Sequence, residues 1–181
     1  WKSVLENVCF GQKMKGVAKA ERVQQAQNLI ELVGLKGFEH KYPAELSGGM
    51  QQRVEIARVL INQPRVLLMD EPFGALDAQT RLKMQELLLE IWQNIQTSVL
   101  FITHDIDEAL FLADRVLIMS HRPGRIIEEI KLDFARPRHV DLVTSPEFTQ
   151  IKKHCIQVLK HATQAELSRL NPLGLNQKVA V

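Results

Sequence analysis

The sequence predicts an α/β fold in which a helical segment precedes a parallel sheet. Over residues 1–62, apolar side chains recur at helical spacing and no strand-like run appears. Two short apolar runs follow, at 66–69 and 99–102, separated by a long helical pattern. Strand, helix, strand in this order is typical of a parallel sheet with crossover helices. We expect a helical subdomain over residues 1–62, an α/β core over 63–135 and a helical tail over 136–181.

Three helices are expected in the first part, over residues 3–11, 15–33 and 47–62. The first begins at Ser3, which stands three residues before Glu6, the spacing of a capping box. The third follows a serine, a residue type favoured at helix N-caps.

The core is expected to alternate strands and helices. Because both apolar runs lack polar alternation, we expect both strands to be buried on two faces. The order strand, helix, strand, helix, strand favours continuing the parallel sheet into the strand at 115–120. The expected strands are 66–70, 99–103, 115–120 and 125–132, and the expected helices are 78–96, 105–113 and 146–163.

Composition excludes several classes of protein. The chain has 181 residues, 45% of them hydrophobic and 24% charged, as in ordinary globular proteins. Its net charge of +2 is too small to predict a nucleic-acid partner. Cys9 and Cys155 lack the spacing of a metal site or redox motif, so free thiols are expected. No run has the length of a membrane-spanning helix, so work at a membrane would require a partner.

Acidic residues end the first apolar run. Asp70 would lie at the carboxyl edge of the sheet, where open α/β folds bind ligands, and can hold Mg²⁺ directly or through water. The adjacent Glu71 points elsewhere and can polarise a water for attack on a phosphoryl group. A solvated acidic loop is the alternative. His104 follows the neighbouring strand, so it could reach the same phosphate, although a lone histidine is more often a capping or core residue.

The segment Ser47-Gly48-Gly49 opens the third helix and is called the glycine turn below. Backbone N–H groups at a helix start attract anions, and glycines let a phosphate approach without a Cβ in the way. The alternative is an ordinary N-cap with loop glycines. Asp77, after Gly74-Ala75-Leu76, could cap the helix that begins at residue 78, with or without a further role.

Four segments together resemble the ATP-binding domain of ABC transporters, a P-loop NTPase fold: LSGGMQQR at 46–53, VLLMDEP at 66–72, GALD at 74–77 and THD at 103–105. The resemblance implies that Glu71 is the catalytic base and that His104 contacts the γ-phosphate. It implies that Asp70 binds Mg²⁺ through water. It implies nucleotide contacts, to ATP held by a second subunit, from Ser47, Gly48, Gly49, Gln51 and Asp77.

Two further segments, RPGRI at 122–126 and ARPR at 135–138, resemble the ATPases of nitrate, sulfonate, taurine and bicarbonate importers. That resemblance implies a head-to-tail dimer with ATP and Mg²⁺. It implies transmembrane permease subunits, an indirect periplasmic or lipid-anchored substrate-binding protein, and a peripheral location on the cytoplasmic face of the inner or plasma membrane.

The sequence departs from the family at its beginning. It contains no G-x-x-x-x-G-K-[ST] motif, and we expect the P-loop, the adenine-stacking aromatic residue and the Q-loop glutamine to precede Trp1. The chain is therefore expected to be a fragment that exposes apolar edges and does not hydrolyse ATP by itself. Two alternatives stay open: a soluble ABC-type ATPase unconnected with transport, and a truncated paralogue that pairs with a complete subunit.

Overall fold

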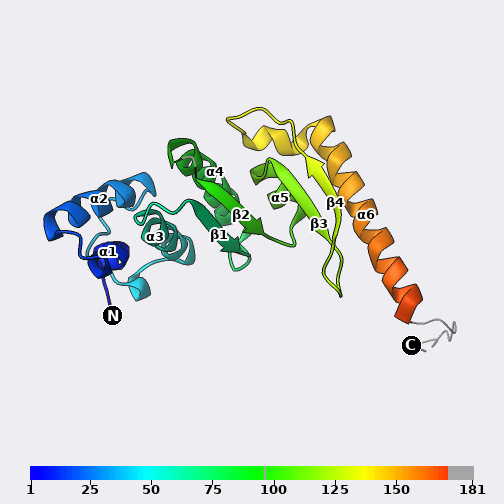
Figure 1. Cartoon of the computed structure of the whole chain (residues 1–181). Coiled ribbons are helices and arrows are strands. Elements are labelled where there is room, and N and C mark those ends of the chain that lie inside the picture. The colour runs from blue at the N-terminus through cyan, green and yellow to red at the C-terminus, as the bar shows by residue number, and fades with distance from the viewer. Residues whose placement is uncertain (96, 171–181) are drawn as a thin grey trace, which may run out of the picture. The chain divides into compact units, whose positions relative to one another are not determined.

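The computed structural model describes residues 1–95 and 97–170. The chain forms two compact units, Trp1–His104 and Asp105–Val181. Each unit has helices and a two-stranded sheet of its own (Figure 1). The units divide inside the segment 63–135, and the three-part organisation stays a prediction. Residues 171–181 of the predicted tail lie outside the described part of the chain.

The first unit opens with three helices that pack on one another, α1 (Val4–Met14), α2 (Lys19–Leu32) and α3 (Gly48–Leu60). The expected capping box is present, with Ser3 and Glu6 exchanging hydrogen bonds at the start of α1. The expectation that the second helix begins at residue 15 was wrong: α1 continues further, and Gly16, at φ +77°, makes the turn between them. A short 3₁₀ turn, η1 (Pro43–Glu45), lies between α2 and α3 in the chain.

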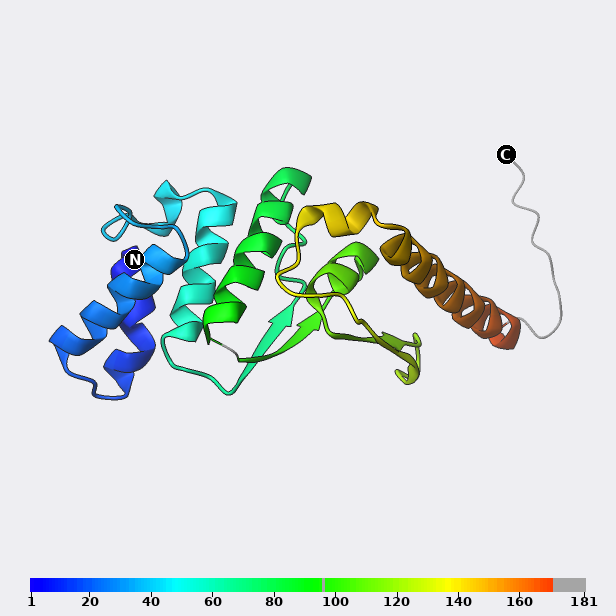
Figure 2. The ribbon, with the colours of Figure 1, turned by 90° about the horizontal axis from the view of Figure 1, so that it is seen from above.

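The sheet of this unit consists of β1 (Val66–Asp70) and β2 (Ser98–Ile102), which pair in parallel as predicted. The crossover between them contains α4 (Ala78–Ile95), which lies beside α3 (Figure 2). Leu67 of β1 lines a small apolar cavity with Leu88 of α4, so α4 covers one face of the sheet. The Trp92 indole N–H donates to the Thr97 carbonyl at 2.8 Å, which ties the end of α4 to the start of β2.

The sequence predicted that both strands are buried on two faces, and this prediction was wrong. Leu67 and Met69 are buried, but the alternate residues Leu68 and Ile102 are 71% and 53% exposed. The reason is the number of layers: in the described part of the chain, β1 and β2 receive cover from α4 on one side only. An unbroken apolar run therefore leaves an exposed apolar face in this chain.

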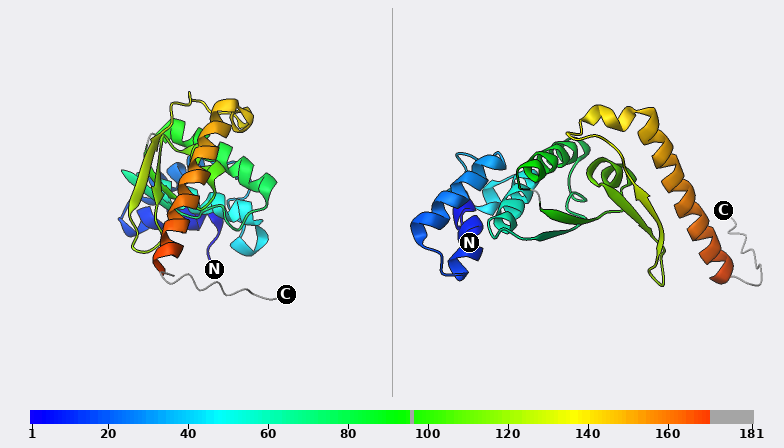
Figure 3. Two further views of the ribbon diagram at one scale, coloured as in Figure 1. Left: turned by 90° about the vertical axis from the view of Figure 1, so that its right-hand side faces the viewer. Right: turned by 45° about the horizontal axis from the view of Figure 1, so that its top comes forward.

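The second unit contains α5 (Ile106–Leu112), β3 (Arg115–Met119), β4 (Ile126–Lys131), η2 (Val140–Thr144) and α6 (Pro146–Leu170). Two strands around the turn at 122–124 were expected, and the hairpin of β3 and β4 is antiparallel, because a tight turn joins antiparallel neighbours. Among the described residues β3 pairs with β4 and not with β2, so the predicted parallel order ends at β2. The helix α6 packs on β3 and is longer than the predicted 146–163 (Figure 3).

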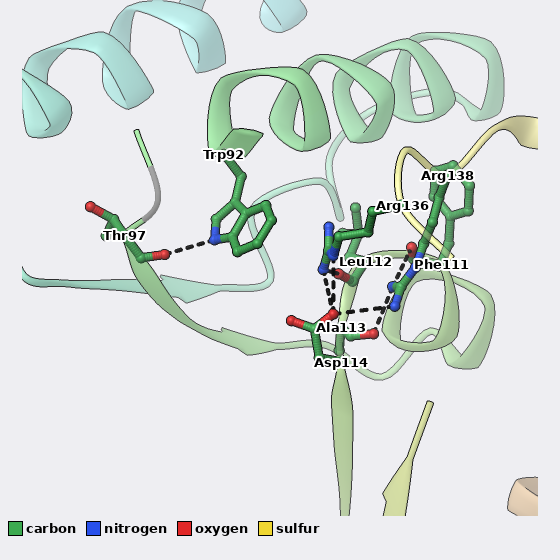
Figure 4. A network of polar contacts seen from close by, with 8 residues as sticks. All are labelled: Trp92, Thr97, Phe111, Leu112, Ala113, Asp114, Arg136 and Arg138. Atoms are coloured by element: carbon green, nitrogen blue, oxygen red, sulfur yellow. Dashed lines mark hydrogen bonds and ion pairs between the residues drawn. The ribbon is translucent and has the colours of Figure 1, made fainter. Parts of the chain in front are cut away.

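Two arginines of the ARPR segment hold the end of α5 (Figure 4). The guanidinium of Arg138, whose side chain is fully buried, donates to the carbonyls of Phe111 at 3.0 Å and Ala113 at 2.6 Å. Arg136 donates to the Leu112 carbonyl and forms an ion pair with Asp114 at 2.7 Å. The last carbonyls of a helix lack partners within it, so these arginines act as its C-terminal cap.

Candidate functional site

The predicted acidic residues lie where the two parallel strands end. Asp70 is the last residue of β1 and is paired in register with Ile102, the last residue of β2. The backbone N–H of Glu71 donates to the Ile102 carbonyl at 2.8 Å, so the chain stays attached to the sheet as it turns. Glu71 has a φ of +43°. A non-glycine residue at positive φ is strained, and such residues cluster at functional sites.

The structure brings Glu71 and His104 together. Oε1 of Glu71 lies 3.0 Å from Nδ1 of His104, and the two side chains are 53% and 76% exposed. The parallel register places one residue after each strand at the same edge, and the turn at Glu71 directs its carboxylate to the imidazole. We call Asp70, Glu71 and His104 the strand-end cluster. It presents two carboxylates and an imidazole to solvent, which suits contact with a phosphoryl group and a water.

Asp70 is exposed and belongs to no preformed metal cage. Among the described residues, no group of three or more His, Cys, Asp or Glu could hold a metal ion. Mg²⁺ in phosphoryl-transfer sites is usually held by one or two carboxylates, waters and the phosphates of the substrate. One exposed aspartate at the strand end fits that requirement, and this chain would supply only part of the coordination.

The glycine turn forms the start of α3. Ser47 is the N-cap residue in extended conformation, and its Oγ accepts from the Met50 N–H at 3.4 Å. Ser47 and Gly48 are exposed, whereas Gly49 is buried. Ser47 is therefore an N-cap, as the alternative reading of the sequence held, and the cap is compatible with anion binding by the turn. An anion could approach the exposed part of the turn, where N–H groups at the start of α3 lack helical partners.

The two glycines differ in their surroundings. A Cβ atom at Gly48 would lie 3.8 Å from Cδ2 of Leu76, an ordinary contact. A Cβ atom at Gly49 would lie 2.8 Å from Cγ2 of Thr80, closer than real Cβ atoms approach other atoms. Gly49 thus has a packing requirement within the chain, in addition to the phosphate approach that the sequence suggested for both glycines.

The side chain of Gln51 turns back on the segment before α3. Its amide donates to the carbonyls of Pro43 at 2.9 Å and Leu46 at 3.3 Å. This contact fixes the loop that leads into the glycine turn. Any contact of Gln51 with a nucleotide stays a prediction.

Asp77 caps α4, as the sequence allowed. Its Oδ1 accepts from the Thr80 N–H at 3.0 Å. Hydrogen bonding by Thr80, through its side chain and then its backbone N–H, lowers the pKa of the Asp77 carboxyl. Sequence reasoning missed Thr80, whose methyl group lies against Gly49. A threonine three residues after an N-cap aspartate was the available signal for the hydrogen bond, but its contact with Gly49 had none.

Together, the fold and the strand-end cluster define the class of this protein: it is an α/β protein whose candidate site lies at the carboxyl ends of a parallel strand pair. A solved dimeric bacterial ABC transporter cassette has the same fold, with a TM-score of 0.61 and 34% identity, over 74% of this chain and 58% of that one. The ABC transporter family matches residues 1–74.

Three relatives illustrate the match. An uncharacterized ABC transporter ATP-binding protein of Methanocaldococcus jannaschii is 53% identical, over 88% of this chain and 59% of that protein. A taurine import ATP-binding protein of Rhizobium johnstonii is 49% identical, over 91% and 64%. A nitrate import ATP-binding protein of a Synechocystis species is 46% identical, over 88% and 62%. The chain belongs to the ABC transporter ATP-binding proteins, and it spans about three fifths of the length of these relatives.

In residues 1–95 and 97–170, no helix combines the length and the apolar character needed to cross a bilayer.

Proposed function

We propose that the whole protein is the ATP-hydrolysing subunit of an ABC importer that takes up a small sulfonate or oxyanion. The observation that supports this best is the contact between Glu71 and His104 at the ends of two parallel strands, with Asp70 beside it. The taurine and nitrate import proteins among the relatives support the importer assignment and the substrate class. The permease, the substrate-binding protein and the cytoplasmic face of the membrane belong to the same proposal.

In this proposal the strand-end cluster serves the nucleotide bound on its own side of a head-to-tail dimer. Glu71 accepts a proton from the attacking water, and His104 holds that carboxylate in place while contacting the γ-phosphate. Asp70 would hold Mg²⁺ through water, and the ion would offset negative charge on the phosphates.

The glycine turn would serve the other nucleotide of the dimer. Ser47 and Gly48 are exposed at the N-terminus of α3, where the helix dipole favours an anion. Gly49 lies beneath them, Gln51 fixes the approach to the turn, and Asp77 lies in the loop before α4. One chain thus offers two half-sites, and each is completed by groups outside it.

A soluble ATPase unconnected with transport and a truncated paralogue are less well supported. The import proteins match 88% to 91% of this chain, including the hairpin and part of α6 beyond the strand-end cluster. Similarity over both compact units favours the importer class for the whole chain.

The test uses the intact subunit assembled with its permease and binding protein in liposomes. We expect ATP hydrolysis and uptake to be stimulated by taurine or nitrate, and not by an uncharged solute of similar size. Stimulation by the uncharged solute alone would contradict the substrate class. Hydrolysis that ignores every solute and the permease would contradict the importer assignment.

A further inference from the structure

The glycine turn contacts the start of α4 within the same chain. Cγ2 of Thr80 would lie 2.8 Å from a Cβ at Gly49, and Cδ2 of Leu76 would lie 3.8 Å from one at Gly48. The helices α3 and α4 also contact each other. The backbone of Gly49 therefore seats the methyl group of Thr80, and no larger residue fits at position 49 without movement.

Thr80 cannot yield easily to such a residue. Its N–H donates to Oδ1 of Asp77 at 3.0 Å, and this hydrogen bond fixes the backbone of Thr80 at the start of α4. Because threonine is β-branched, few alternative rotamers are open to it in a helix.

We propose that Thr80 is a positioning residue that couples Asp77 to the glycine turn of the same chain. Its N–H is held by Asp77 and its methyl group is seated on Gly49, so a shift of the loop at 74–77 shifts the turn. This inference rests on the proposed function, in which the turn and Asp77 belong to the ATP sites of a dimer. It adds a contact within one subunit between two segments that serve those sites.

The coupling makes a prediction about why position 49 is glycine. If the nucleotide alone required it, an added methyl group would obstruct the phosphate whatever stands at position 80. If Thr80 requires it, removal of the Thr80 methyl group would make room for the added one. The two explanations are separated by Gly49→Ala alone and in combination with Thr80→Ser, which deletes the methyl group and keeps the hydroxyl.

The experiment measures kcat and KM for ATP hydrolysis by the intact subunit in its permease complex, together with the urea midpoint of the purified subunit. Gly49→Ala is expected to lower kcat/KM about tenfold, because the overpacked methyl group displaces the glycine turn from the nucleotide. Gly49→Ala with Thr80→Ser should return kcat/KM to within about threefold of Thr80→Ser alone, within the scatter of independent substitutions. Gly49→Ala with Thr80→Val is the matched control, because valine keeps a methyl group against Gly49, and it should show no recovery.

The connection through Asp77 is tested by a second cycle. Asp77→Ala and Gly49→Ala should each lower kcat/KM, and the double variant should lose less than the two single losses multiplied, since both act through the position of Thr80. Losses that multiply would overturn the coupling. Recovery of the urea midpoint in Gly49→Ala with Thr80→Ser, without recovery of kcat/KM, would also overturn it. A failure of the proposed function would instead appear as an inactive wild-type complex, whereas failure of this inference appears with an active one.

Discussion

The carboxylate of Glu71 and the imidazole of His104 lie 3.0 Å apart, although 33 residues separate them in the chain. Parallel pairing of β1 and β2 brings the two residues to the same sheet edge, and the positive φ of Glu71 completes the approach. Both side chains are exposed, so their contact contributes little to folding. Their arrangement is better explained by contact with a substrate than by stability.

His104→Ala should lower turnover of the assembled transporter about a hundredfold, because it removes a group that contacts the γ-phosphate and holds Glu71. The measurement is steady-state ATP hydrolysis at saturating ATP. His121→Ala, at an exposed histidine in the loop between β3 and β4, is the matched control and should leave turnover unchanged. Equal activity of the two variants would remove His104 from the site.

Arg138→Ala should destabilise the protein by about 3 kcal/mol, because loss of the buried guanidinium leaves main-chain carbonyls at the end of α5 without donors. Urea unfolding of the intact subunit measures the effect. Arg122→Ala, at an exposed arginine in the loop between β3 and β4, should change the free energy of unfolding by less than about 0.5 kcal/mol. A similar small change for both variants would contradict the capping role of Arg138.

Asp77→Asn should remove a pH-dependent part of the stability. The Thr80 hydrogen bonds lower the pKa of Asp77 in the folded protein. Its ionised form therefore adds stability above the ordinary pKa of an aspartate, and this is lost as the pH falls through the lower, folded value. The urea midpoint of the wild type should exceed that of the variant at pH 7, and the two should converge in acid. A difference that grows toward low pH would contradict this sign.

Ser3→Ala should destabilise the protein by about 1 kcal/mol through loss of the cap of α1. Ser98→Ala, at an exposed position that begins β2, is the comparison and should have little effect on the urea midpoint. The capping box would be irrelevant to stability if the two variants unfolded at the same urea concentration.

Much of this architecture was predictable because it depends on local sequence. Short-range patterns predicted the bounds of β1 and the caps at Ser3 and Ser47. The order strand, helix, strand predicted the parallel pairing. The exposed face at Leu68 could not be predicted, since an apolar run does not reveal how many layers cover a sheet. The turn at 122–124 predicted two strands around it, which form the hairpin of β3 and β4, but the parallel order was extended too far along the chain.

The candidate site also contains features that the sequence predicts and features that it does not. Residue types and their places at strand ends predicted the approach of Glu71 and His104, because parallel register is a property of the whole sheet. The backbone strain at Glu71 has no marker in its residue type. The contact between Gly49 and Thr80 depends on how α3 packs on α4, which no local pattern encodes.

Glu71→Gln offers the most direct test of the proposed catalysis, because it keeps the shape of the side chain and removes the base. In the assembled transporter we expect ATP turnover to fall by about a hundredfold or more, with ATP binding retained. Glu86→Gln, at an exposed glutamate of α4, should hydrolyse ATP at the wild-type rate. Turnover by Glu71→Gln equal to that of Glu86→Gln would contradict the assignment of Glu71 as the base.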